Sequence, residues 1–204
     1  MNRLKSMPER EKFQHAFEMV RLYHKHVLPF VEKYLGYAEM YNLRSVWQAA
    51  IIPMHEKDPD TEKYNHAYSN WLWMARCSHD LLFERLSAEA LSEYKRLLVR
   101  IKEQQLDNPN LFFLCKFKAH AMLAKNLLYE MQWLTPLELS SQGKEEVMGT
   151  IHACKIVQTP GTERVCHMDC QSVGTAFALT VYHLKRVTFP ASHGCKIILT
   201  PTTV

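Results

Sequence analysis

The chain has 204 residues, 47% of them hydrophobic and 23% charged, which is typical of a globular protein with an apolar core and not of a disordered chain. The net charge is +4 with the basic residues spread along the chain, so no basic cluster predicts a nucleic-acid partner. No apolar leader and no run of about 18 apolar residues is present, so we expect a cytoplasmic protein without a signal peptide or a membrane span.

The first predicted helix begins near Ser6, whose spacing from Glu9 is that of a capping box. Apolar residues then recur at every third or fourth position, which indicates one buried helical face. The residues of this face are Phe13, Phe17, Val20, Tyr23, Val27, Phe30 and Tyr34. Pro29 has no backbone N–H, so it should kink or split the helix near Val27, and Gly36 is the expected stop.

Three further helices follow in chain order. The second should cover residues 37–52 and end at Pro53. Asp58 and Pro59 are the residue types expected at the N-cap and first position of the third helix. Ser87 is the expected N-cap of the fourth.

A fifth helix is predicted from Asn108–Pro109 to Thr135–Pro136, and it is apolar enough for the middle of a bundle. Glu130 in this helix and Asp80 in the third helix are carboxylates in apolar helical surroundings. Burial would raise the pKa of either group and suit it to acid–base work.

Trp71 and Trp73 lie close together in the aromatic third helix. Aromatic residues at helical spacing most often pack in a core. They can also form the wall of a ligand pocket, and both alternatives stay open for this pair.

The last third of the sequence changes pattern. Residues 137–146 are polar and predict a connector, whereas residues 147–157 are β-prone. A helix should cover residues 163–184, and short strands should cover residues 186–189 and 195–200. This order gives a β-α-β-β unit with one helix on a small antiparallel sheet.

The predicted fold class is therefore α+β. A helical body of about five helices should occupy residues 1–136, with a connector over residues 137–146. A cysteine-rich α+β unit should occupy residues 147–204, and the two parts could form one integrated domain.

Four of the six cysteines lie in this C-terminal unit. Cys166 and Cys170 are four residues apart, so they share one face of the predicted helix. Cys195 shares a strand face with Ile197 and Leu199, and if that face meets the helix, Cys195 approaches the other two thiols.

Three interpretations of these cysteines compete. They can be small buried apolar residues. They can form a thiol site, with Cys166 or Cys170 as thiolate and His193 or His167 as proton carrier. They can also bind zinc or iron through four thiolates, namely Cys154, Cys166, Cys170 and Cys195, although the paired C-x2-C spacing of structural zinc sites is absent.

The pattern Cys166-x3-Cys170, helix, strand and Cys195 resembles the C-terminal part of the L-2-amino-thiazoline-4-carboxylic acid hydrolase-like family. The resemblance covers Cys166 to Leu199. It implies a hydrolase that opens a cyclic C–N bond of a thiazoline-like molecule, with the three cysteines at or near its site. The same arrangement is similar to ligand-sensing modules related to the vinyl-reductase domain, and that similarity implies binding of a metal or a small ligand without chemistry.

We therefore expect a cytoplasmic hydrolase-like enzyme with a small-molecule substrate, and no nucleic-acid or membrane partner. Trp71, Trp73, Phe177 and Cys195 are the candidate ligand-binding residues. The alternatives are a sensor module that holds a metal or ligand through the same cysteines, and a helical interaction protein in which they only pack.

Overall fold

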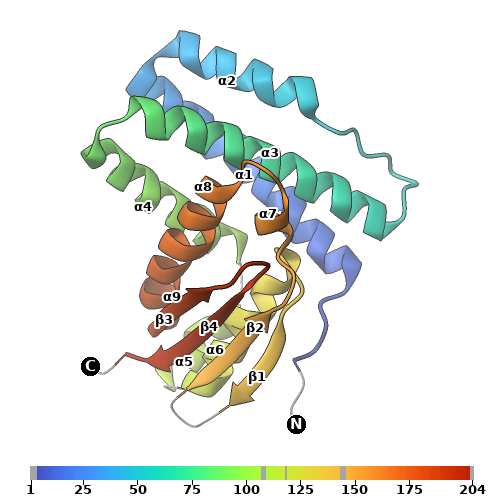
Figure 1. Ribbon diagram of the computed structural model, residues 1–204, viewed down its shortest axis with the longest axis vertical. Helices are drawn as coiled ribbons and strands as arrows, with labels where there is room; N and C mark the ends of the chain where they lie inside the picture. Colours follow the sequence, from blue (N-terminus) through green and yellow to red (C-terminus); the bar gives the residue numbers. More distant parts are fainter. Residues whose placement is uncertain (1–3, 107–108, 118, 143–145, 203–204) are drawn as a thin grey trace.

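A computed structural model of the chain describes residues 4–106, 109–117, 119–142 and 146–202, and it has an α+β fold with an N-terminal helical body (Figure 1). The helices of the body are α1 (Glu9–Leu35), α2 (Tyr37–Ala50), α3 (Asp60–Arg85), α4 (Ala88–Gln105), α5 (Pro109–Lys116), α6 (His120–Glu130) and the 3-10 turn η1 (Met131–Trp133). The C-terminal part contains β1 (Glu138–Gln142), β2 (Val147–Ile151), α7 (Lys155–Gln158), α8 (Glu163–Val165), the π-helix η2 (Cys166–Val173), α9 (Gly174–Tyr182), β3 (Leu184–Pro190) and β4 (Cys195–Pro201).

Helix α1 is longer and less interrupted than the sequence predicts. It begins at Glu9 after Pro8, without a side-chain cap from Ser6, and Pro29 lies inside it without ending it. The helix packs along α3, so tertiary contacts hold it together across the hydrogen bond that Pro29 cannot make. Gly36 ends the helix at φ 89°, as predicted.

The starts of the next helices follow the predictions closely. Helix α3 begins at Asp60, two residues after the predicted cap, because the Asp58 carboxyl instead accepts a hydrogen bond from the His55 N–H at 2.7 Å. The predicted cap of α4 is confirmed, since Ser87 Oγ accepts from the Ala90 N–H at 3.3 Å.

The predicted fifth helix is two helices, α5 and α6. The break is at Ala119, whose φ of −78° and ψ of 59° are not helical. The predicted start at Asn108 lies outside the described residues. The short 3-10 turn η1 then ends this part of the chain before Thr135.

The sheet contains a strand that the sequence prediction missed. Strand β1 lies in the segment predicted as a connector and pairs antiparallel with β2, with an irregular register between Leu139 and Ser141. Its polar sequence, Glu-Leu-Ser-Ser-Gln, has none of the apolar enrichment that marks a strand. The strand order is β1-β2-β4-β3, and all neighbours are antiparallel.

Two other boundaries of the C-terminal part differ from the prediction. Strand β2 ends at Ile151, and the predicted extension to residue 157 is instead the one-turn helix α7. The predicted helix 163–184 is divided into α8, the π-helix η2 and α9, and it stops at Tyr182 because His183 adopts a left-handed conformation at φ 53°.

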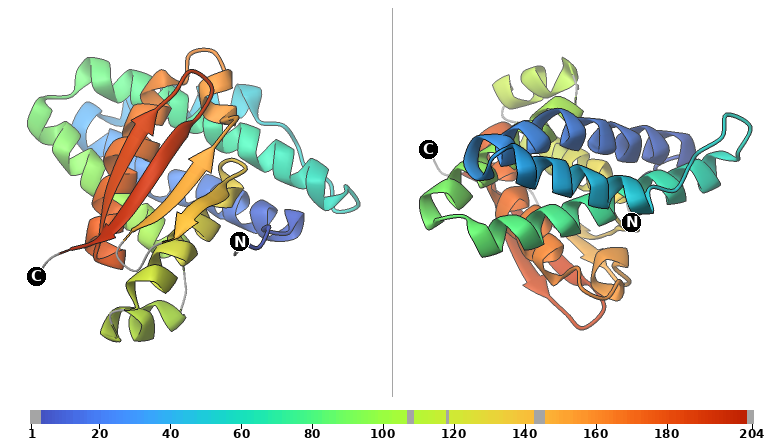
Figure 2. Two further views of the ribbon diagram at one scale, coloured as in Figure 1. Left: turned by 60° about the horizontal axis from the view of Figure 1, so that its bottom comes forward. Right: turned by 90° about the horizontal axis from the view of Figure 1, so that it is seen from above.

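One face of the sheet carries the buried residues of β2, β3 and β4. Leu184 and Arg186 of β3 alternate with exposed Lys185 and Val187, so the buried set faces α9, against which β3 packs. Figure 2 shows the helices α9 and α6 behind the sheet, with the helical body beyond them. The buried apolar residues form one continuous cluster from α1 to β4. None of the described helices is both long and apolar enough to cross a membrane.

The two carboxylates singled out in the sequence have different surroundings. Asp80 is exposed and pairs with Arg164 at 3.0 Å, so it is not the buried acid that its apolar neighbours suggested. Glu130 at the end of α6 is largely buried, and burial, followed by the charge of Glu11, raises its pKa to about 7. The ring of His15 lies 3.4 Å from it, and burial lowers the pKa of that ring, so burial favours the neutral form of both groups.

This raised pKa makes stability depend on pH. The pKa of Glu130 is about 7 in the folded chain and 4.5 in the unfolded chain, so the folded chain holds the proton more tightly. The stabilisation from this carboxyl is therefore complete below pH 4.5 and is lost as the pH rises through about 7. Glu130→Gln should increase the free energy of unfolding by about 1–3 kcal/mol at about pH 8 and change it little at about pH 5. Urea unfolding at both pH values checks this. Glu103→Gln, at an exposed position of α4, is the matched control, and a loss of stability in Glu130→Gln at the higher pH would contradict the explanation.

Candidate functional site

Four cysteines line one enclosed cavity of about 50 Å³. Cys154 comes from the N-terminus of α7, Cys166 and Cys170 from η2, and Cys195 from the start of β4. The other walls are largely apolar and include Leu134, Ile151, Ile156, Val157, Thr188 and Ala191. The predicted approach of Cys195 to the thiols of the helix is therefore present, and Cys154 joins them. We call this space the cysteine cavity.

Backbone pairing brings the strand cysteine and the loop cysteine together. Cys195 is opposite Ile151 in the register of β4 and β2. Three residues after Ile151, the Cys154 N–H donates to the His193 carbonyl at 2.8 Å, which ties the start of α7 to the loop between β3 and β4. Gly194 lies in the same loop, and a Cβ there would be 1.8 Å from the Ile151 carbonyl oxygen, so only glycine permits this approach.

The helix cysteines lie on a π-helix rather than on regular α-helix. Helix η2 spans Cys166–Val173, and both Cys166 and Cys170 face the cavity. π-Helical turns are rare and are frequent at functional sites, so the wide turn at these two thiols supports a role beyond packing. Gln171 Nε2 donates a weak hydrogen bond to Cys166 Sγ at 3.7 Å.

A buried cation completes the wall of the cysteine cavity. Arg186 lies on the inner face of β3 and is 5% exposed. Its one described hydrogen bond runs from Nε to Thr188 Oγ1 at 3.3 Å, and it forms no ion pair with a described acidic residue. Its guanidinium packs on Gly174, where a Cβ would lie 2.2 Å from Nη1. A buried charge without a counterion is costly, so this site is suited to an anion.

Three thiols of the cavity, those of Cys166, Cys170 and Cys195, have raised pKa values. Burial raises the pKa of Cys170 to about 12, that of Cys195 to about 11, and also that of Cys166. The positive charge of Arg186 opposes this shift at all three thiols, and Lys102 opposes it at Cys170. A bound ligand that takes a proton would therefore be needed to form a thiolate.

A buried polar network anchors η2 to the helical body. Asp169 Oδ2 is 2.5 Å from His79 Nε2, and Asp169 Oδ1 accepts from the Tyr23 hydroxyl at 3.3 Å. His79 Nδ1 is 3.1 Å from the Tyr94 hydroxyl, and Lys102 Nζ donates to the Asp169 carbonyl at 2.9 Å. Sequence reasoning missed this network because its members come from helices far apart in the chain. The one sequence feature that could have indicated this network is Asp169, an acidic residue directly before Cys170 on the predicted helix.

The two predicted proton carriers lie away from the cavity. The side chains of His167 and His193 are exposed, and neither is among the described residues that line it. His193 contributes its backbone carbonyl rather than its ring. The structure therefore brings the cysteines together but not these histidines, and Arg186, which sequence reasoning did not identify, is the charged group at the thiols.

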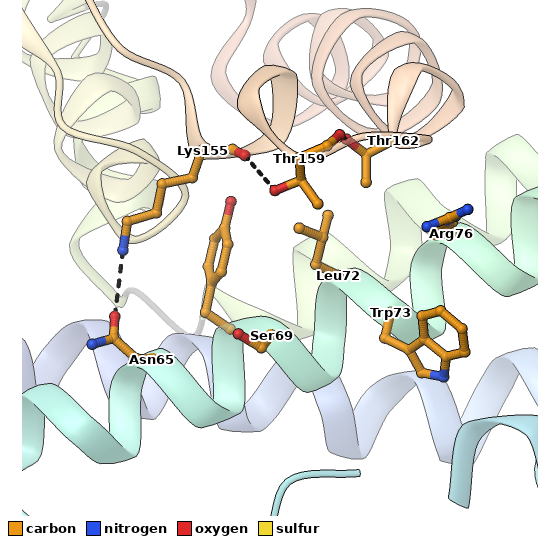
Figure 3. A pocket seen from close by; sticks show the side chains of 9 residues that line it. Asn65, Ser69, Leu72, Trp73, Arg76, Lys155, Thr159 and Thr162 are labelled. Carbon is orange, nitrogen blue, oxygen red and sulfur yellow. Dashed lines mark hydrogen bonds between the residues drawn. The ribbon is translucent and has the colours of Figure 1, made fainter. Parts of the chain in front are cut away.

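The predicted aromatic residues are divided among three places. Trp71 is 1% exposed and packs edge-on against Trp133 in the core. Phe177 lies beside Gly174 and Arg186 in a cavity of about 30 Å³ next to the cysteine cavity. Trp73 lines a separate groove on the other side of α7, which Figure 3 shows.

The proposed four-thiolate metal site lacks the required geometry within the described ranges. No three His, Cys, Asp or Glu side chains there are grouped closely enough to hold a metal ion, although four cysteines share one cavity.

No protein-family model, curated protein sequence or solved structure matches the chain.

Proposed function

We propose that the protein is a hydrolase-like enzyme that opens a C–N bond of a small cyclic molecule in the cysteine cavity. The observation that carries this proposal is that Cys166, Cys170 and Cys195 line one cavity. Arg186 is the charged residue among the described residues that line it. The C-terminal resemblance to thiazoline carboxylate hydrolases, given by the same three cysteines, supports the same reaction.

The proposed chemistry uses one thiol as nucleophile. The sulfur of Cys166 or Cys170 bonds to the ring carbon, the C–N bond breaks, and the nitrogen takes the thiol proton. Water then displaces the sulfur, leaving its oxygen on the carbon and returning a proton to the thiol. Because the free thiols are neutral, transfer of the thiol proton to the substrate nitrogen is consistent with their raised pKa values.

Arg186 has two roles in this proposal. Its guanidinium binds the carboxylate of the substrate, because a buried guanidinium without an acidic partner offers a strong charge-assisted hydrogen bond. Its charge also favours the thiolate that forms during the attack, since it lowers the pKa of each cavity thiol that it faces.

The alternative is a sensor module that binds a small anion without chemistry. The observation that favours it is the upward shift of the thiol pKa values, which leaves little thiolate at neutral pH. In that case Arg186 would still bind the anion, and the cysteines would supply only a soft apolar wall.

Incubation with L-2-amino-2-thiazoline-4-carboxylate tests the enzyme proposal, with product detected by mass as the gain of one water. We expect turnover by the wild type and a loss of about 10³-fold or more in kcat for Cys166→Ser or Cys170→Ser, whichever residue attacks. Cys77→Ser, on α3 outside the cavity, is the control and should retain full activity.

Binding without turnover would favour the sensor module over the enzyme. Turnover that survives combined replacement of Cys166, Cys170 and Cys195 would contradict the thiol mechanism. A circular dichroism spectrum of each variant shows whether a loss reflects chemistry or folding.

A further inference from the structure

A second and larger hollow lies on the other side of α7 from the cysteine cavity. It is a groove of about 400 Å³, within the size range of ligand pockets. One turn of helix separates the two spaces, because Cys154, Ile156 and Val157 line the cysteine cavity whereas Lys155 and Thr159 line the groove. Figure 3 shows this groove between α3 and the segment that contains α7.

The floor of the groove is one face of α3. Its residues recur at intervals of three and four and span about three helical turns, or roughly 16 Å. They are Asn65, Tyr68, Ser69, Leu72, Trp73 and Arg76. The floor thus combines an apolar and aromatic surface with polar groups at each end.

Lys155 is the cation of the groove without an acidic partner. Its ammonium lies 4.7 Å from the ring centroid of Tyr64 and 5.3 Å from that of Tyr68. Its one described hydrogen bond reaches Asn65 Oδ1 at 3.5 Å, and it forms no ion pair with a described acidic residue. Figure 3 shows this side chain reaching down to Asn65 at one end of the floor.

The cation at the other end already has partners. Arg76 is 3.9 Å from Asp80, donates to the Pro160 carbonyl at 3.3 Å, and lies 5.9 Å from the Trp73 ring centroid. Among the described residues, Glu9 acts on Lys155 only at longer range and pairs directly with Lys12 at 2.6 Å, so Lys155 is the cation of the groove that is open to a ligand with one negative charge.

Tyr68 contributes to the floor through its ring. The residue is 5% exposed, and its hydroxyl is buried and makes no hydrogen bond with a described residue. A ligand in the groove therefore contacts the side chain of Tyr68 without reaching its hydroxyl.

We infer that the groove between α3 and α7 is a binding site for an aromatic carboxylate, separate from the cysteine cavity. The carboxylate pairs with Lys155, and the ring lies on Leu72 and Trp73. This inference does not depend on the proposed enzyme activity.

Titration of the full chain with 2-naphthoate, followed by calorimetry, tests the site, with 2-naphthalenemethanol as the neutral probe of the same shape. We expect saturable one-site binding of the carboxylate and binding of the alcohol that is weaker by about tenfold or more. Lys155→Gln should weaken naphthoate binding by a similar factor. Lys185→Gln, at an exposed position on β3, should leave it unchanged.

Two more variants localise the site. Ser69→Trp fills the groove from an exposed position of α3 and should abolish binding even if Lys155→Gln proves unstable. Arg186→Gln alters the cysteine cavity and should have no effect. Equal binding of the acid and the alcohol, wild-type affinity in Ser69→Trp, or loss of binding in Arg186→Gln would each overturn the inference.

Discussion

Replacement of Asp169 by alanine is expected to lower the free energy of unfolding by about 3–5 kcal/mol. The side chain is 1% exposed and contacts His79 at 2.5 Å and the hydroxyl of Tyr23 at 3.3 Å. Its removal leaves an imidazole and a phenol buried without their partner, and each such group costs its full desolvation. Urea unfolding followed by circular dichroism measures the loss.

Asp80→Ala is the matched control for this prediction. Asp80 is also an aspartate with basic partners, Arg164 at 3.0 Å and Arg76 at 3.9 Å, but its side chain is 43% exposed. Exposed ion pairs contribute little, so we expect a change below about 1 kcal/mol. Similar losses in the two variants would show that the buried network does not hold η2 in place.

The second large effect is expected at Gly194. A methyl group there would meet the Ile151 carbonyl oxygen at 1.8 Å, and this oxygen belongs to the backbone, so no side-chain rotation relieves the clash. Gly194→Ala should therefore cost about 3 kcal/mol or more and should also separate Cys195 from Cys154. Thermal unfolding measures the first effect, and a changed alkylation rate of Cys195 measures the second.

Gly36→Ala is the control that distinguishes the steric clash at Gly194 from the cost of placing alanine at a backbone conformation that favours glycine. Gly36 has a φ of 89°, and nothing lies within 4 Å of an added Cβ. The expected cost is about 1–2 kcal/mol, from the left-handed backbone alone. If Gly194→Ala costs no more than Gly36→Ala, the close approach of the β3–β4 loop to β2 is not needed for folding.

The helical body was the part of the fold most open to sequence reasoning. Helical spacing and end signals are local, so Ser87 and Gly36 could be assigned from their neighbours alone. The break at Ala119 could not, because apolar residues recur throughout residues 109–131 and no Gly or Pro follows Pro109 in this range as a stop signal. Strand β1 was missed for the opposite reason, since its polar residues are held by pairing with β2 rather than by their own propensity.

The candidate site was predicted in part. Helical and strand periodicity placed Cys166, Cys170 and Cys195 on facing surfaces, and all three line the same cavity. Arg186 could not be singled out, because a lone arginine in a strand is normally directed to solvent. Gly174 leaves room for its guanidinium in the buried position.

For the histidines, closeness to a cysteine in the sequence did not predict contact with it in the structure. His167 and His193 are each next to or near a cysteine in sequence, yet their rings are exposed. His79, remote in sequence, is the histidine that pairs with the aspartate preceding Cys170. Neighbours along a helix or at a strand end point in different directions, so sequence proximity to a thiol did not indicate contact with it.

The central claim is that Arg186 and the thiols act together on an anionic ligand. The most direct measurement is the ratio of alkylation rates by iodoacetate and by iodoacetamide at Cys166 and Cys170, read by mass spectrometry, with Cys77 as the internal reference outside the cavity. The same thiolate attacks both reagents and displaces iodide from each, so the ratio reports attraction of the carboxylate rather than the thiol pKa. We predict a ratio about tenfold higher at a cavity thiol than at Cys77, and a return to the Cys77 ratio in Arg186→Gln. Equal ratios at all sites in the wild type would contradict the claim.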